Sequence, residues 1–111
     1  MMVSLVERGE QMALLEMVAD NDEIASLVLS CYNDNGINYR TTGDVTRAIS
    51  EYKKALFISP GDEHLYYNIA RAIIEMGDKR AVEESINMAL KLNPQFYEGL
   101  KLQNYIVQWT P

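Results

Sequence analysis

Two stretches of the sequence match each other, GDVTRAISEYKKALFISP at residues 43–60 and GDKRAVEESINMALKLNP at residues 77–94. Each position of the first has its counterpart in the second, from Gly43 with Gly77 to Pro60 with Pro94. Gly-Asp opens both stretches, Ala-Leu recurs in both, and proline closes both. A period of about 34 residues, kept through turns as well as helices, is typical of a solenoid built from helix–turn–helix units.

The repetition extends upstream of both stretches. The counterparts there are Tyr32 with Tyr66, Gly36 with Ala70, and Tyr39 with Ile73. Asn35-Gly36 alone would be a turn signal, but the repeat places Gly36 inside a helix. Small residues such as Gly36 and Ala70 allow helices to approach closely, and large residues such as Tyr32 and Tyr66 fill the space between them. Helical periodicity alone does not separate a bundle from a solenoid, so the fixed period is what favours the solenoid.

The spacing and residue types of these units resemble those of the tetratricopeptide repeat family. The resemblance covers two full units, residues 29–62 and 63–96. It implies an all-α solenoid of antiparallel helix pairs with about six helices. We interpret residues 1–28 as a degenerate leading unit and residues 97–111 as a capping helix, within one domain spanning residues 1–111.

Turn and capping residues predict the helix boundaries. Gly43 and Gly77 are expected to end helices, and the aspartate after each is expected to cap the next helix. Asn93-Pro94 is interpreted as the start of the last helix, with asparagine as its N-cap and proline at its first position. The helices expected from these features cover residues 2–20, 23–40, 45–58, 63–76, 79–92 and 95–108.

Composition restricts the function classes. The chain has 111 residues, a net charge of −6 and one cysteine. An acidic chain is a poor ligand for nucleic acid, since phosphate binding requires an excess of Lys and Arg. No disulfide framework can form from one cysteine, and charged residues interrupt the apolar N-terminus before a signal peptide or a membrane span is reached. A cytoplasmic protein without membrane or nucleic-acid partners is expected.

Catalytic and metal-binding patterns are absent from the sequence. It has no Gly-rich phosphate loop and no Cys or His pair at metal-ligand spacing. The one pair worth testing is Cys31 with His64, because a Cys–His nucleophile requires direct hydrogen-bond reach. The repeat places Cys31 in the core as a small apolar residue and His64 on the concave face, so no such contact is expected. We therefore predict no enzyme, no catalytic residue, no metal site and no cofactor.

The resemblance implies a partner-binding surface. In tetratricopeptide repeat proteins, the first helix of each unit lines a concave groove that often holds an extended peptide. The matching positions here are Asn33, Ile37, Arg40, His64, Tyr67, Arg71, Ile74, Lys101 and Tyr105. The apolar and aromatic members would form a stripe that soluble monomers rarely expose without use. The three cations would meet acidic groups of the ligand.

Two functions remain open from the sequence. The first is a non-catalytic adaptor, scaffold or chaperone-like module that binds a peptide or helix of a partner protein. The alternative is a structural module that forms a homodimer or larger homo-oligomer through its groove or its terminal helices. Tyr105 and Trp109 are expected to be partly exposed and to join either the groove or the dimer contact. A clamp for a C-terminal carboxylate is not expected, because of its usual residues only Asn68 is present.

Overall fold

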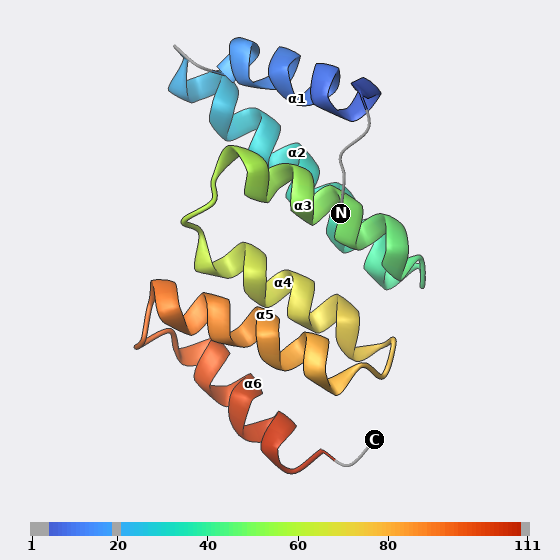
Figure 1. The fold of residues 1–111 in the computed structure, drawn as a ribbon, viewed down its shortest axis with the longest axis vertical. Coiled ribbons are helices and arrows are strands. Elements are labelled where there is room, and N and C mark those ends of the chain that lie inside the picture. The colour runs from blue at the N-terminus through green and yellow to red at the C-terminus, as the bar shows by residue number, and fades with distance from the viewer. Residues whose placement is uncertain (1–4, 19–20, 110–111) are drawn as a thin grey trace.

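A computed structural model describes residues 5–18 and 21–109 (Figure 1). These residues form six helices and no strand. The helices are α1 (Leu5–Val18), α2 (Asp22–Thr41), α3 (Val45–Ile58), α4 (Glu63–Ile74), α5 (Lys79–Leu92) and α6 (Tyr97–Val107). They follow one another along the longest axis of a molecule measuring 44 × 28 × 26 Å. The fold is an all-α solenoid of the kind that the sequence predicts; residues 2–4 and 19–20 of the first expected helix lie outside the described residues.

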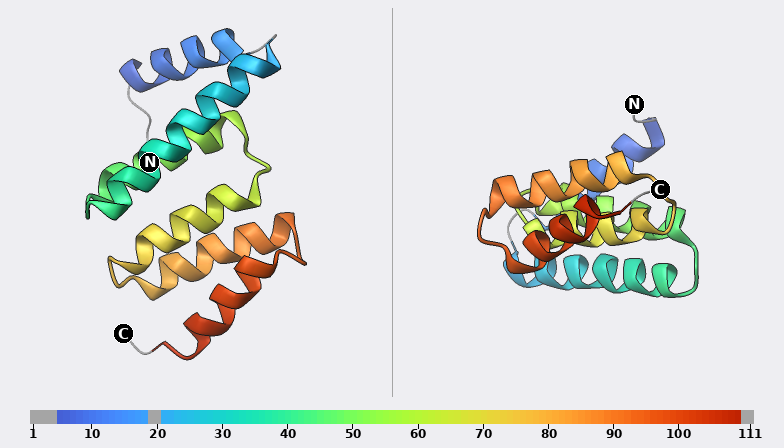
Figure 2. Two further views of the ribbon diagram at one scale, coloured as in Figure 1. Left: turned by 180° about the vertical axis from the view of Figure 1, so that it is seen from behind. Right: turned by 90° about the horizontal axis from the view of Figure 1, so that it is seen from below.

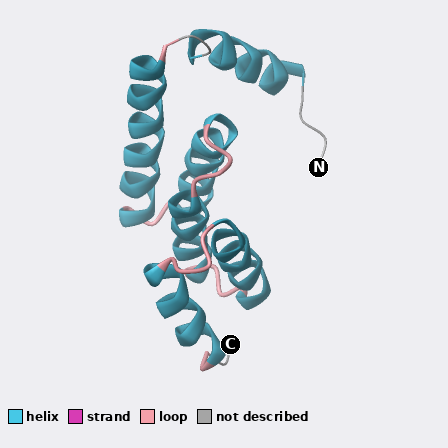
Figure 3. Ribbon diagram, turned by 90° about the vertical axis from the view of Figure 1, so that its left-hand side faces the viewer, coloured by secondary structure: helices cyan, strands magenta, loops and turns pink. Residues whose placement is uncertain are grey.

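Consecutive helices pack as two hairpins. α2 packs on α3 and α4 packs on α5, while the contact between α3 and α4 joins the hairpins. The left view of Figure 2 shows the same order from behind. α6 packs on α5 at one end of the array. At the other end α1 contacts α2 and extends away from its N-terminal end at a steep angle (Figure 3).

The capping residues place the helices as the sequence predicts. Asp44 accepts a hydrogen bond from the backbone N–H of Arg47 at 3.2 Å, and Asp78 accepts one from Ala81 at 3.1 Å. The glycines before them have φ values of +89° at Gly43 and +75° at Gly77. A residue with a Cβ rarely adopts this left-handed conformation, so glycine ends the preceding helix in both units.

The core consists of two clusters, one in each half of the array. Ala48, Tyr52, Ile69 and Ala72 form the first, where the two hairpins meet. Ala70, Val82, Ile86 and Ile106 form the second, between α4, α5 and α6. Because α4 contributes to both clusters, it joins the two halves.

The start of the last helix differs from the prediction. Asn93 is the C-cap of α5, where its N–H donates to the Ala89 carbonyl at 2.9 Å. Its side-chain oxygen then accepts from the Gln95 N–H at 3.2 Å, and its carbonyl accepts from the Phe96 N–H at 3.0 Å. These local hydrogen bonds form a turn around the proline, so α6 begins only at Tyr97. α4 is also shorter than predicted, since it ends at Ile74 in a turn that leads to Gly77.

The prediction that Cys31 is buried is wrong. Cys31 is exposed. It lies one helical turn after Leu27, whose exposed fraction is 62%. Both residues therefore lie on an exposed face of α2. The burial of Cys31 depends on the leading helix, which the two-unit pattern does not place.

Candidate functional site

A cleft of about 400 Å³ lies between α2 and the N-terminal part of α4. α2 contributes one wall, with side chains spaced three to four residues apart along one face. The lining residues are Leu29, Ser30, Asn33 and Ile37 from α2, and Asp62, His64, Leu65 and Asn68 from α4 and its cap. The cleft combines apolar walls with a few polar groups, which is usual for ligand sites in proteins.

Two asparagines connect the walls of the cleft. The Asn68 side-chain amide donates a hydrogen bond to Oδ1 of Asn33 at 2.8 Å, and the pair is partly buried. This bond uses one donor hydrogen of Asn68 and the oxygen of Asn33. Within the described residues, the Asn33 amide group and the Asn68 oxygen make no other hydrogen bond. They offer a donor and an acceptor side by side, which is the complement of a peptide group.

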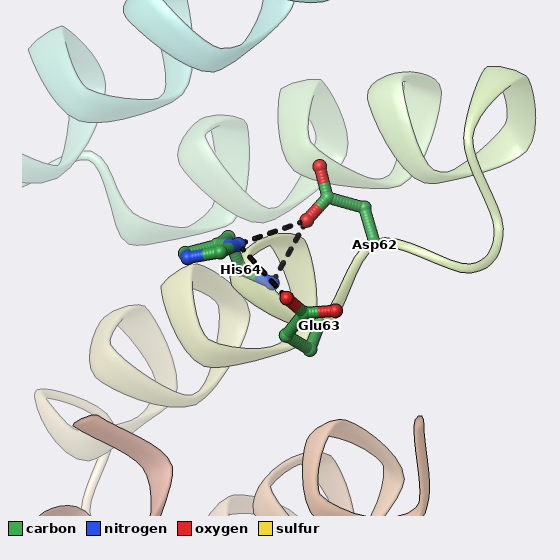
Figure 4. Close-up of side chains that lie close together, drawn as sticks. All are labelled: Asp62, Glu63 and His64. Carbon is green, nitrogen blue, oxygen red and sulfur yellow. Dashed lines mark hydrogen bonds and ion pairs between the residues drawn. The ribbon is translucent and has the colours of Figure 1, made fainter. Parts of the chain in front are cut away.

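The N-terminus of α4 brings Asp62, Glu63 and His64 together (Figure 4). Asp62 Oδ1 accepts the backbone N–H of His64 at 2.9 Å and lies 3.3 Å from Nδ1 of the ring. Glu63 Oε1 lies 3.4 Å from the same nitrogen. Two features argue against a metal ion between these side chains. The helix N-terminus carries a positive partial charge that would repel a cation, and one Asp62 oxygen already caps the helix. We interpret the three side chains as a helix cap that also orients His64.

His64 has an aromatic neighbour that fixes the edge of the cleft. Its ring meets Phe96 edge to face, with ring centroids 4.9 Å apart. Tyr67 meets the same Phe96 ring at 5.6 Å. Phe96 is itself buried. The turn that precedes α6 therefore places Phe96 against His64 and Tyr67, the two predicted groove residues of α4 that it contacts.

The remaining predicted residues lie outside the cleft lining. Arg40 is half-buried at the C-terminal end of α2, on the face that bears Asn33 and Ile37. The Arg71 guanidinium lies 5.8 Å from the centre of the Tyr67 ring. Ile74 packs on the second core cluster and is half-buried, so it exposes less surface than the sequence predicts.

α6 carries the last two predicted positions. Lys101 is exposed, with its ammonium nitrogen 5.5 Å from the centre of the Tyr97 ring. Tyr105 is exposed, as predicted. Trp109 is half-buried against the second core cluster, and this agrees with the expected partial exposure.

Of the nine predicted residues, the cleft thus brings together Asn33, Ile37 and His64. The predicted set omitted Asn68, although it forms the only hydrogen bond between side chains of α2 and α4 in the described part of the chain. Asn68 lies 35 residues after Asn33, one position beyond the repeat period, so a strict comparison of equivalent positions does not pair them. Asp62 likewise lies in the cleft lining while its side chain caps α4.

The profile of the tetratricopeptide repeat family matches residues 63–96. Residues 63–96 are thus a tetratricopeptide repeat unit. The matched unit holds the hairpin of α4 and α5, and the hairpin of α2 and α3 shows the same glycine turn and aspartate cap at the equivalent positions, Gly43 and Asp44. A search of curated proteins found no match for the chain. None of the helices in the described residues has the length and apolar character needed to cross a membrane.

Proposed function

We propose that this protein is a non-catalytic interaction module that holds a segment of a partner protein in the cleft between α2 and α4. The observation that carries the proposal is the cleft itself, with its pair of bridged asparagines. Repeat solenoids use their concave surfaces for binding other proteins. The family match supports a role in protein–protein interaction.

The chemistry of the cleft suits an extended segment. Leu29, Ile37 and Leu65 offer apolar contacts for side chains. The free donor and acceptor on Asn33 and Asn68 suit one backbone peptide group between those contacts. A segment held this way keeps its backbone polar groups satisfied while burying alternate side chains, which is how extended peptides are usually recognised.

A module that binds a segment of a partner without catalysing a reaction on it would act as an adaptor or in a chaperone-like role. The net charge of −6 argues against nucleic acid as the partner. A cytoplasmic location and the absence of a membrane partner are part of this proposal.

Selection from a random peptide library displayed on phage tests the function. The wild-type protein should enrich a consensus, and the Ile37→Gln variant should lose it, because Ile37 forms part of the cleft wall. Phe57→Gln is the matched control. Its exposed fraction of 38% is close to the 36% of Ile37, but it lies on α3 outside the cleft. Equal enrichment by all three proteins, or no enrichment by the wild type, would overturn the proposal.

Self-association is the second candidate function, and α6 carries the observation that favours it. Tyr97, Leu100, Tyr105 and Val107 are exposed on this single helix. Apolar surface at the end of a repeat array is suited to docking a second copy. Light scattering across a concentration range separates the two functions: the interaction module should stay monomeric, whereas a dimer that Tyr105→Gln dissociates would favour self-association.

A further inference from the structure

One face of α6 is open where the equivalent face of α4 is covered. Ala70 in α4 corresponds to Asn104 in α6, one repeat later, and Ile73 corresponds in the same way to Val107. α5 packs over Ala70 and Ile73, so the first has no exposed surface and the second is half-buried. Asn104 is exposed, and the exposed fraction of Val107 is 74%. No helix follows α6 among the described residues, and this face therefore has no second helix over it (Figure 1).

The open face of α6 consists of Leu100, Asn104 and Val107, which lie about one helical turn apart along one side of the helix. It borders a cleft of about 210 Å³ between α5 and α6, which we call the end cleft. The end cleft is lined by Glu83, Ile86 and Asn87 from α5 and by Gln103, Ile106 and Val107 from α6. Leu100 and Val107 are exposed at the two ends of the open face, with Asn104 between them. A ligand of this face therefore meets apolar groups on both sides of a polar centre.

Asn104 distinguishes the open face from the covered faces of α2 and α4. The same repeat position holds Gly36 in α2, which packs against the ring of Tyr52 in α3. It holds Ala70 in α4, which shares a core cluster with Ile86 of α5. In both hairpins a small residue thus faces a large side chain of the second helix. An asparagine covered by such a side chain would lose its hydrogen bonds to water, so a helix over the open face requires a polar residue opposite Asn104.

The chain itself shows how two helices make such a polar contact. The Asn68 amide of α4 donates to Oδ1 of Asn33 in α2 at 2.8 Å, at a partly buried place between the helices. A glutamine on a docking helix can pair with Asn104 in the same way, because each side-chain amide offers a donor and an acceptor. Gln103 offers a second amide beside Asn104, in the lining of the end cleft.

We infer that the open face of α6 is a second docking site, which takes an amphipathic α-helix of a partner protein. The helix lies against α6 as α5 lies against α4, and its contact residues have the spacing of Val82, Ile86 and Ala89, with an amide side chain at the middle position. A second copy cannot supply α3 or α5, because both helices bury these contact positions within their own chain. The site lies on a different pair of helices from the cleft between α2 and α4, so it does not depend on the proposed function.

Fluorescence anisotropy with two labelled helical peptides tests the inference. Both copy residues 79–92, because α5 is the helix that covers the equivalent face of α4. A side-chain cross-link between positions 84 and 88, which α5 exposes, keeps the peptides helical, since isolated helices of this length are marginal in water. The first peptide keeps isoleucine at position 86, and the second carries Ile86→Gln. The wild-type protein should bind the glutamine peptide about tenfold more tightly, because isoleucine would leave the Asn104 amide without a partner.

Two variants of the protein assign the binding to the open face. Asn104→Ala restores the small residue of the covered faces and should reverse the preference, so that the isoleucine peptide binds more tightly. Val107→Asp should weaken the binding of both peptides, because it places a charge among the apolar contacts. The matched controls are Asn38→Ala and Leu27→Asp, which change an exposed asparagine and an exposed aliphatic residue of α2 and should keep the wild-type preference. Circular dichroism checks that all four variants remain helical.

The inference and the proposed function fail in different ways. Equal binding of the two peptides, no binding of either, or a preference that Asn104→Ala leaves unchanged would overturn the inference. Binding that survives Val107→Asp would overturn it too, because the peptide would then lie elsewhere on the protein. A wild-type dimer that Val107→Asp dissociates, seen by light scattering, would assign the open face to a second copy in place of a partner helix. The library selection with Ile37→Gln concerns only the cleft between α2 and α4, so its failure would overturn the proposed function and leave the open face of α6 as a docking site.

Discussion

The ring of Tyr52 in α3 packs directly against the backbone of Gly36 in α2. A Cβ placed on Gly36 would lie 2.7 Å from Cδ1 and 2.8 Å from Cζ of this ring. Tyr52 has no solvent exposure, so the ring has no room to move outward. The closest contact of the first hairpin therefore depends on the absence of a side chain at one position.

We expect Gly36→Ala to destabilise the protein. Overpacking a core contact costs about 1–3 kcal/mol, while alanine in a helix returns about 1 kcal/mol over glycine. The free energy of unfolding, measured by urea denaturation, should fall by up to about 2 kcal/mol. Gly9→Ala is the control, since a Cβ there meets no atom within 4 Å and α1 gains helix propensity. A Gly36→Ala variant as stable as Gly9→Ala would show that the two helices are not in close contact.

Tyr52→Phe should leave stability unchanged or raise it. The Tyr52 hydroxyl is buried and makes no hydrogen bond within the described residues. An unpartnered buried hydroxyl costs about 1–3 kcal/mol, and phenylalanine keeps the ring in place. Thermal unfolding followed by circular dichroism should give an equal or higher Tm. A clear drop in Tm would mean that the hydroxyl is hydrogen-bonded in solution.

Ile106→Ala should be far more costly than Val107→Ala. These neighbours in α6 have exposed fractions of 2% and 74%. Ile106 belongs to the core cluster with Val82 and Ile86, so its loss leaves a cavity and should cost about 2–5 kcal/mol. Val107→Ala should change the free energy of unfolding by less than about 0.5 kcal/mol. Similar effects of the two substitutions would show that α6 does not pack on α5 in this register.

The Cys31 thiol should react with a colorimetric disulfide reagent in the folded protein, because its side chain is exposed. We expect one thiol to react before denaturant is added, at a rate close to that of the unfolded chain. Reaction only after unfolding would show that Cys31 is buried in the folded protein, as the repeat alone predicts. It would also mean that α1 covers this face of α2.

The repeat predicts the fold best where both units carry the same turn residues. The bounds of α3 and α5 follow from Gly43 and Gly77, whose left-handed backbone ends one helix, and from the aspartates that cap the next. Gly36 inside α2 was correctly kept helical against its local turn signal. In these places the local chemistry and the repeat agree.

The prediction is wrong where one residue can serve two roles or where no repeat neighbour exists. Asn93 can cap a helix at either end, and its three hydrogen bonds commit it to the end of α5. Cys31 occupies a core position only if a full unit precedes it. In the site, the hydrogen bond between Asn33 and Asn68 joins residues that are 35 positions apart, one more than the repeat period. It can therefore be recognised only when both side chains are placed in space.

The most direct test of peptide binding in the cleft is a titration of isotope-labelled protein with the library-selected peptide, followed by NMR. The side-chain amide signals of Asn33 and Asn68 report on the cleft, and the backbone signals of Phe57 and Val107 report on surfaces outside it. We predict that the peptide shifts both asparagine side-chain signals and the Ile37 signals, while those of Phe57 and Val107 stay in place. Shifts confined to α6 or to the outer surface of α3, with both asparagine signals unmoved at saturation, would contradict the assignment of the cleft as the binding site.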